Sequence, residues 1–123
     1  MFPVIDGHFW VERNGEIIDP DFEYYDTIKR VNKCKGKAIH LPASSIAQQV
    51  VIKAFKKAED FYGVKDSDYL GRRPQVNCCY QNARQEVIER GGTLVFGSMG
   101  WRNKTGIHYE FGGDGWTVSQ FLK

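Results

Sequence analysis

Two short runs of strand-forming residues flank Asn14-Gly15 and give the clearest pattern in the chain. Asn-Gly between such runs favours a two-residue hairpin turn, because a type I′ turn needs positive φ at both central positions. The predicted register places Arg13 opposite Glu16 and His8 opposite Asp21. Side chains alternate along a strand, so four residues of the hairpin share one face. These residues are His8, Trp10, Ile17 and Asp19.

Hydrophobic residues recur at helical spacing over residues 44–63. Ser44 or Ser45 can cap the start of this helix, and Gly63 is a typical end signal. The lysines of the segment fall mainly on the other side, so we expect one face to pack on the core. The expected packing positions are Ile46, Val50, Val51, Ala54, Phe55, Ala58, Phe61 and Tyr62.

A second helix is predicted from Cys78 or Cys79 to Arg90. Asn77 is a favourable N-cap, and Gly91-Gly92 is a strong end signal. The polar segment that precedes this helix is expected to form a loop or short turn.

Short strands are expected at residues 38–41 and 93–96, and a last hairpin at residues 107–111 and 116–121. Residues 97–106 are expected to form a flexible connection. These elements predict an α+β fold in which a small antiparallel sheet packs against two helices. At 123 residues, the chain is expected to be a single globular domain, 1–123.

Composition and charge exclude several classes of protein. With 41% hydrophobic and 26% charged residues and no long apolar run, the chain is expected to be neither disordered nor membrane-bound. The 17 basic and 15 acidic side chains give a formal net charge of +2, which disfavours nucleic acid as the partner. The basic run at residues 29–37 is interpreted as a solvated loop, and nucleic-acid binding through it stays a minor alternative.

Free thiols are expected, because three cysteines cannot all pair within one chain and Cys78 and Cys79 are adjacent. Free thiols, and an N-terminus without a basic segment followed by an apolar core, indicate a cytoplasmic protein. Neither CxxC nor HxxxH occurs, so we expect no metal and no cofactor. The sequence leaves the oligomeric state open.

Cys79 is the candidate nucleophile. A thiol at a helix N-terminus lies near unpaired backbone N–H groups and the positive end of the helix dipole, and both favour the thiolate. Helical spacing places Cys79 in a row with the apolar Ala83 and Val87, so it should face the sheet, whereas Cys78 lies on the polar face. The alternative interpretation of Cys79 is a small buried hydrophobic residue.

His8 and Asp19 offer the other two groups of a nucleophilic triad. They are diagonal neighbours on one face of the predicted hairpin, within reach of each other's side chain. An imidazole held by a carboxylate is the base that an attacking thiol needs. A second arrangement uses His108 as the base, with Glu110 or Asp114 as its partner.

Two blocks of the chain carry a resemblance to known enzymes. The first is Cys79-Tyr80-Gln81-Asn82-Ala83, which opens a helix ending in Gly91-Gly92 and precedes Leu94-Val95-Phe96-Gly97. The second is His8-Phe9-Trp10-Val11-Glu12, with Asn14-Gly15 and Ile18-Asp19-Pro20. These blocks resemble small papain-like and transglutaminase-like cysteine hydrolase domains, in which a Cys begins a helix, a His-x-Trp strand supplies the base and an Asp-Pro orients it.

The resemblance implies that Cys79 is the nucleophile, His8 the general base and Asp19 the orienting carboxylate. In the usual order the Cys helix precedes the His and Asp strands, whereas here it follows them. The chain therefore resembles a circularly permuted papain-like (cysteine proteinase-like) arrangement.

The expected function is a cysteine-dependent hydrolase or acyltransferase that acts on an amide, thioester or ester of a peptide or small acyl substrate. The backbone N–H of Cys79, with Gln81 or Asn77, could hold the oxyanion. The alternative is a non-catalytic peptide- or ligand-binding or inhibitory module that uses the same aromatic-lined cleft, to which Trp116 contributes. The expected substrate-binding residues are Trp10, Gln81, Asn82, Trp101 and His108.

Overall fold

The predicted N-terminal hairpin is present in the computed structural model. Strand β1 (His8–Arg13) pairs with strand β2 (Glu16–Ile18), and Arg13 lies opposite Glu16. The two residues of Asn14-Gly15 have φ of 53° and 77°, as a type I′ turn requires. The predicted register is therefore confirmed over residues 11–13 and 16–18; β2 ends at Ile18, before Asp21. The structure describes residues 2, 7–21, 37–73, 75 and 78–109.

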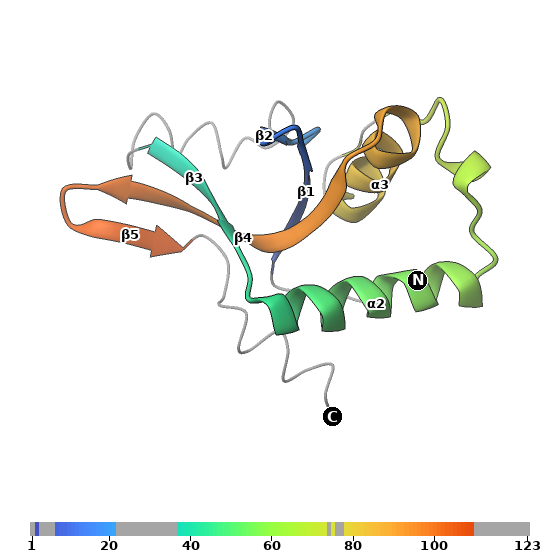
Figure 1. Ribbon diagram of the computed structural model, residues 1–123, viewed down its shortest axis with the longest axis horizontal. Helices are drawn as coiled ribbons and strands as arrows, with labels where there is room; N and C mark the ends of the chain where they lie inside the picture. The colour runs from blue at the N-terminus through green and yellow to red at the C-terminus, as the bar shows by residue number, and fades with distance from the viewer. Residues whose placement is uncertain (1, 3–6, 22–36, 74, 76–77, 110–123) are drawn as a thin grey trace.

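Strand β4 (Thr93–Asn103) is the long central strand of the sheet (Figure 1). One edge of β4 pairs first with β1 and then with β5 (Gly106–Tyr109), and the other edge pairs with β3 (Lys37–Pro42). All these pairs are antiparallel, and the strand order is β2-β1-β4-β3 with β5 beside β4. Because β4 exchanges one partner for another along its length, the sheet is curled (Figure 1).

The prediction that residues 97–106 form a flexible connection was wrong. Strand β4 runs on to Asn103, and a tight turn leads directly into β5. The glycines of this stretch serve close backbone approach: a Cβ on Gly97 would lie 2.3 Å from the Leu41 carbonyl oxygen, and one on Gly100 would lie 2.1 Å from the His108 carbonyl oxygen. The expected last partner strand, residues 116–121, lies outside the described residues.

Helix α2 (Ser45–Phe61) follows β3 directly. The Ser44 hydroxyl accepts a hydrogen bond from the Ala47 N–H at 3.2 Å, so Ser44 is the predicted N-cap. The helix then gives way to Gly63, whose φ of 67° suits a glycine beyond a helix end. A short 3-10 helix, η2 (Asp66–Asp68), lies between α2 and the second long helix.

Helix α3 (Cys79–Arg90) begins and ends where the sequence predicts. Its N-cap is Cys78, which corrects the expectation that Asn77 caps it; Asn77 lies outside the described residues. The Cys78 side chain caps none of the first-turn N–H groups that the structure describes. The helix therefore presents donors at its N-terminus without a capping side chain from that residue.

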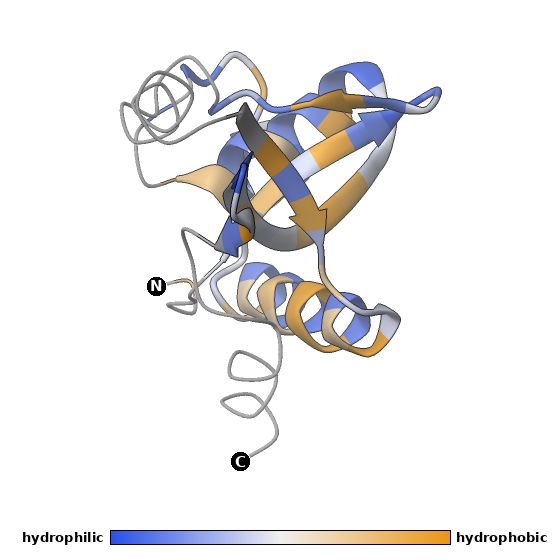
Figure 2. Cartoon of the chain, turned by 90° about the vertical axis from the view of Figure 1, so that its left-hand side faces the viewer, coloured by the Kyte–Doolittle hydropathy of each residue, from blue (hydrophilic) through white to orange (hydrophobic). Residues whose placement is uncertain are grey.

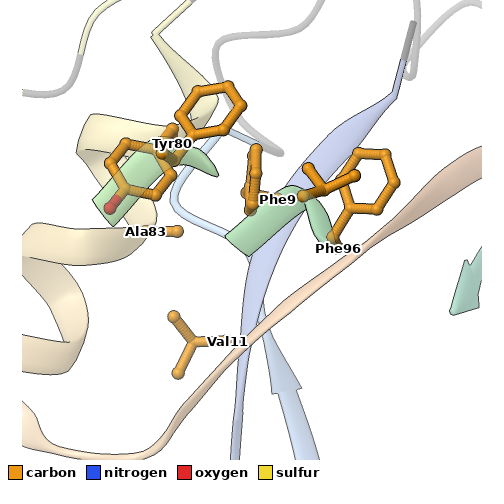
Figure 3. Packing of buried hydrophobic residues seen from close by; sticks show 7 residues of the cluster. Phe9, Val11, Tyr80, Ala83 and Phe96 are labelled. Atoms are coloured by element: carbon orange, nitrogen blue, oxygen red, sulfur yellow. The ribbon is translucent and has the colours of Figure 1, made fainter. Parts of the chain in front are cut away.

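The hydrophobic core lies where β1 and β4 meet the two helices (Figure 3). The ring of Phe9 packs edge-on against Phe55 and Tyr80, with centroid distances of 4.9 and 5.0 Å. Aromatic pairs in this geometry add to the free energy gained from burial alone. The core cluster comprises Phe9, Val11, Val51, Phe55, Tyr80, Ala83 and Phe96.

Helix α2 buries less of its predicted face than the spacing indicates. Ile46, Phe61 and Tyr62 are 66%, 82% and 52% exposed, although the pattern assigns them to the core. Hydrophobic and hydrophilic segments alternate along α2 in Figure 2. These three residues lie at the two ends of the helix, whereas the core cluster draws on its middle turns.

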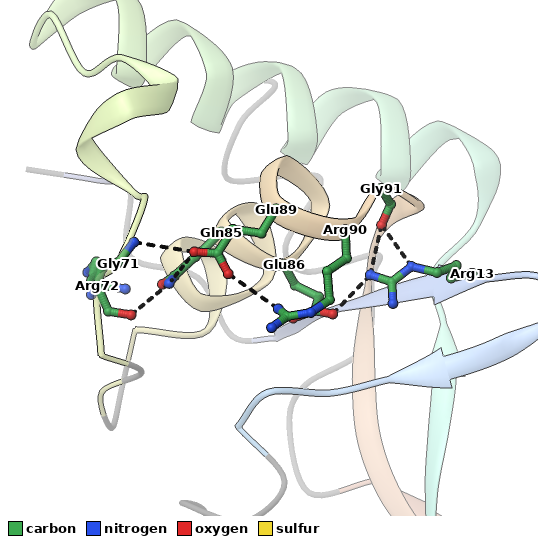
Figure 4. A network of polar contacts seen from close by, with 8 residues as sticks. All are labelled: Arg13, Gly71, Arg72, Gln85, Glu86, Glu89, Arg90 and Gly91. Carbon is green, nitrogen blue, oxygen red and sulfur yellow. Dashed lines mark hydrogen bonds and ion pairs between the residues drawn. The ribbon is translucent and has the colours of Figure 1, made fainter.

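Arg13 ties the hairpin to the C-terminal end of α3 (Figure 4). Its guanidinium donates to the Gly91 carbonyl oxygen at 3.0 and 3.2 Å and pairs with Glu86 at 2.9 Å. Strand β1 and helix α3 are each about 18 Å long by their usual rises per residue. Arg13 and Gly91 lie together where β1 and α3 end. His8 and Cys79, the first residues of these two elements, are therefore brought together at the opposite end.

The segment before α3 is held against the same helix (Figure 4). The Gln85 amide donates to the Arg72 carbonyl oxygen at 2.7 Å, and the Gly71 N–H donates to Glu89 at 3.3 Å.

Taken together, the described residues form an α+β fold with a curled antiparallel sheet and two helices. In this part of the chain, no helix is both long and apolar enough to cross a membrane.

Two substitutions in α2 test the assignment of its core face. Phe55→Ala removes a side chain that is 3% exposed and should lower the free energy of unfolding by about 3–5 kcal/mol. Phe61→Ala, in the same helix but 82% exposed, is the matched control and should change it by no more than about 0.5 kcal/mol. Urea unfolding measures both, and equal losses would contradict the assignment.

Candidate functional site

Two histidines from different strands bond to one carboxylate oxygen. His8 Nε2 lies 2.6 Å from Asp19 Oδ2, and His40 Nε2 lies 2.8 Å from the same atom. The side chains of His8, Asp19 and His40 are 0%, 3% and 11% exposed. Hydrogen bonds to a charged group are strong where water is excluded. Asp19 therefore joins β1 to β3 through their side chains.

The register of the sheet explains why these histidines meet. His8 lies opposite Gly97, and His40 lies opposite Met99, two residues farther along β4. Directly paired residues and residues two apart point to the same face, so both imidazoles lie on one side of the sheet. Gly97 leaves the space that this face needs, because a Cβ there would lie 2.6 Å from the Trp10 ring.

Trp10 covers both imidazoles. Its ring stacks on His8 at a centroid distance of 5.9 Å and lies edge-on to His40 at 4.8 Å. The residue is fully buried. Trp10, which was predicted to contact substrate, packs against the two histidines and helps to keep water from Asp19.

The turn at Asp19-Pro20-Asp21 orients the carboxylate. The backbone N–H of Asp21 donates to Asp19 Oδ1 at 3.0 Å, in the manner of an Asx turn. This bond holds Oδ1, while Oδ2 accepts from His8 and His40. Both oxygens of Asp19 are thus occupied.

Cys79 begins α3 beside His8. Its Sγ, a ring nitrogen of His8 and a carboxylate oxygen of Asp21 all lie within 4.8 Å of one another. Asp19 Oδ2 lies at Nε2 of His8, so a contact of the thiol with the other nitrogen of the ring would use Nδ1. The structure therefore brings together the three residues predicted as a triad, Cys79, His8 and Asp19.

The charges of the site are strongly coupled. Burial by itself lowers the pKa of His8, but the hydrogen bonds and negative charges of Asp19 and Cys79 outweigh it and raise that pKa from 6.5 to about 10. Burial raises the pKa of Asp19, yet the hydrogen bonds from His40 and His8 lower it from 3.8 to about 2. At neutral pH, His8 and Asp19 therefore form an imidazolium–carboxylate pair.

Asp21 is a second buried carboxylate, 1% exposed. The Asn82 amide nitrogen donates to Asp21 Oδ1, and the Asn82 amide oxygen accepts from Arg72 at 2.9 Å. Burial raises the pKa of Asp21. Asn82, which was predicted to contact substrate, is 2% exposed and holds Asp21 in place.

Trp101 and His108, two further predicted substrate contacts, lie in the β4–β5 hairpin. Their rings stack at 5.3 Å, and His108 Nε2 lies 2.6 Å from the Thr105 hydroxyl. Trp101 is four residues along β4 from Gly97, the partner of His8, a separation of about 13 Å. The structure thus does not place these two rings beside Cys79.

Other predicted residues have mixed outcomes. Gln81 is half-buried in the first turn of α3, next to Tyr80 and close to the thiol along the chain. Glu110, Asp114 and Trp116 lie outside the described residues, so the arrangement with His108 as base lacks described partners.

A groove of about 970 Å³ lies along α2 and the start of β4. Ile52 and Lys56 line it from the helix, and Leu94 lines it from the strand. None of the triad residues is among the described residues that line this groove. The site at Cys79 is therefore distinct from it.

His40 and Asp21 are site residues that the sequence analysis did not assign. Asp21 could have been found from the hairpin register, which already places it opposite His8. His40 could not have been found in this way, because it reaches Asp19 only through the pairing of β3 with β4, two strands that are far apart in the sequence.

The expectation of no metal relied on spacings between nearby residues. In the structure, two sets of potential metal ligands come from separate segments of the chain: His8, Asp19 and His40, and His8, Asp21 and Cys79.

Comparison of the chain with protein-family models, with curated proteins and with solved structures found no match.

Replacement of Asp19 by Asn tests the coupling of the charges. Asp19→Asn removes a negative charge that stabilises the imidazolium, so the pKa of His8 should fall from about 10, because burial is then opposed by Cys79 alone. An NMR titration of the His8 ring measures this change. An unchanged titration would contradict the assignment of Asp19 as its partner.

The same pair makes stability depend on pH. The raised pKa of His8 contributes stability that is fully present below about pH 6.5 and is lost as the pH rises through about 10. In urea unfolding, the difference in unfolding free energy between the wild-type protein and Asp19→Asn should therefore decrease from pH 6.5 to pH 10. A constant difference would show that His8 does not titrate in this range.

Proposed function

We propose that this chain is a cysteine-dependent hydrolase or acyltransferase. One observation carries the proposal: a thiol at a helix N-terminus lies within 4.8 Å of a ring nitrogen of His8, and Nε2 of that ring is 2.6 Å from a buried carboxylate. In this arrangement Cys79 is the nucleophile, His8 the acid and base, and Asp19 the carboxylate that orients the ring.

The acylation step follows from the charges of the site. Because the pKa of His8 is about 10, its ring carries a proton at neutral pH. In the proposed reaction Cys79 attacks in its thiolate form, which is the nucleophilic form of a cysteine. A bond forms between Sγ and the carbonyl carbon of the substrate. The proton on His8 Nδ1 then passes to the leaving amine, alcohol or thiol as its bond to that carbon breaks.

The second step regenerates the thiol. Water in a hydrolase, or an amine in an acyltransferase, attacks the acyl carbon and gives its proton to His8. The bond between Sγ and carbon breaks, and the imidazolium again faces a thiolate. The sequence of steps needs no oxidant and no cofactor.

The negative oxygen formed in each step needs hydrogen-bond donors. The N-terminus of α3 offers backbone N–H groups that the Cys78 side chain does not cap among the described residues. The N–H of Cys79 is the donor closest along the chain to the attacking sulfur, and Gln81 is available as a second donor. Removal of one such donor typically lowers the rate by about 100- to 1000-fold.

The spatial arrangement also supports the resemblance to a circularly permuted papain-like or transglutaminase-like domain. A His-x-Trp strand, an Asp-Pro turn and a Cys helix meet at one place, although the helix follows the strand in the chain. The resemblance favours a peptide or small acyl substrate. The thiols of Cys78 and Cys79 are unpaired, which is consistent with a reducing compartment such as the cytoplasm.

A non-catalytic binding module is the second candidate, and the groove along α2 favours it. That groove, of about 970 Å³, combines apolar Ile52 and Leu94 with lysines, as ligand sites often combine apolar and charged residues. A binding module would keep its biological effect in Cys79→Ala, whereas an enzyme would lose it.

Burst kinetics with p-nitrophenyl acetate, an activated ester, test the enzymatic proposal. Wild-type protein should release one equivalent of p-nitrophenolate in a fast phase, because acyl-Cys79 accumulates. Cys79→Ala should abolish the burst, and His8→Gln should slow it by about 100- to 10,000-fold. Cys78→Ser is the matched control, because it removes the thiol next to Cys79 and leaves Cys79, His8 and Asp19 unchanged.

Two outcomes would contradict the proposal. A burst that persists in Cys79→Ala would show that another group is acylated. A burst that is lost in the folded Cys78→Ser variant would show that the neighbouring thiol is the nucleophile. Circular dichroism of each variant establishes that it is folded.

A further inference from the structure

Asp21 has no role in the proposed reaction, although it is one of the most buried residues beside Cys79. Its Oδ1 is held by Asn82, whereas its Oδ2 is buried and makes no hydrogen bond with the residues that the structure describes. A buried carboxylate oxygen without a hydrogen-bond partner is costly. Either its charge is buried without compensation, or the pKa of the carboxyl group rises. The oxygen therefore lies ready for a ligand.

We propose that Cys79, His8 and Asp21 form a binding site for a divalent cation of the zinc class. Sulfur, imidazole nitrogen and carboxylate oxygen are all zinc ligands, and these three atoms lie within 4.8 Å of one another. Zinc ligands in a tetrahedral site lie about 3.3–3.8 Å apart, so the three atoms need to approach by at most about 1.5 Å. Solvent reaches the half-buried Cys79 and can supply a fourth ligand.

The residues around these ligands fit a metal site. A histidine that binds a metal usually donates its other ring N–H to a carboxylate, and His8 Nε2 lies 2.6 Å from Asp19 Oδ2. Asn82 fixes Asp21 in a corresponding way through Oδ1. One thiolate and one carboxylate together neutralise a divalent ion, which lowers the cost of burying the three charges.

The other set of potential ligands, His8, Asp19 and His40, is a weaker candidate. Both imidazole Nε2 atoms already bond to Asp19 Oδ2, at 2.6 and 2.8 Å. An ion there would have to break both hydrogen bonds, and the set lacks a thiolate. Binding at Cys79 breaks neither of them. It releases the proton from the other nitrogen of His8 to solvent, and it occupies the sulfur. A bound cation therefore blocks attack by Cys79, which makes the site a reversible off-switch wherever the proposed reaction operates.

Cobalt(II) is the probe for the site, because a thiolate bound to cobalt gives a charge-transfer band in the near ultraviolet. The test uses Cys34→Ser/Cys78→Ser protein, in which Cys79 is the remaining thiol. We expect the band to appear on titration with Co²⁺ and to be displaced by Zn²⁺. Asp21→Asn keeps an oxygen for Asn82 and should weaken Co²⁺ binding at least tenfold. Asp66→Asn, at a side chain that is 72% exposed, is the matched control and should leave it unchanged.

A second readout does not depend on the Asp21 variant. Zn²⁺ should slow the alkylation of Cys79 by iodoacetamide at least tenfold, and EDTA should reverse the effect. The absence of a thiolate band, or alkylation that Zn²⁺ does not slow, would overturn the proposal. A cobalt spectrum without the thiolate band that disappears in His40→Gln would place the ion on the other set and would also overturn it. Neither readout requires turnover, so failure of the ester burst is a separate result.

Discussion

The hydrogen bond between His8 Nε2 and Asp19 Oδ2 is the contact on which the candidate site depends. It decides which nitrogen of His8 faces Cys79, and it supplies the charge that keeps a fully buried imidazole protonated. His40 bonds to the same oxygen and so links this pair to β3. Without the carboxylate, burial alone would favour the neutral ring.

Several parts of the fold hold that contact in position. Arg13 joins the far end of β1 to the far end of α3, so that His8 and Cys79 meet at the near end. Gly97 leaves the space that the Trp10 ring fills against both histidines. The aromatic core on the helical side then fixes the distance between sheet and helices. The side-chain packing and hydrogen bonds that hold the fold together therefore also hold the site in position.

The sequence predicted the parts of this structure that depend on local chemistry. Asn14-Gly15 determines a turn and with it a register, and Ser44 caps a helix, because these effects act over a few residues. The length of β4 and the place of His40 were not predictable in this way, because they depend on pairing between distant strands. Phe61 was misassigned for a related reason: helical spacing does not tell where a helix extends beyond the sheet it covers. The contact between His8 and Asp19 was predictable because the hairpin brings the two residues together locally.

The proposed reaction requires the Cys79 thiol to lie beside Nδ1 of His8. Treatment with 1,3-dibromoacetone, a short reagent that bridges a thiol and a nearby imidazole, tests this most directly when the linked peptides are identified by mass spectrometry. We predict a link between Cys79 and His8, with the new bond at Nδ1. A link from Cys79 to His108, or the absence of any histidine link in protein whose Cys79 has reacted, would contradict the account.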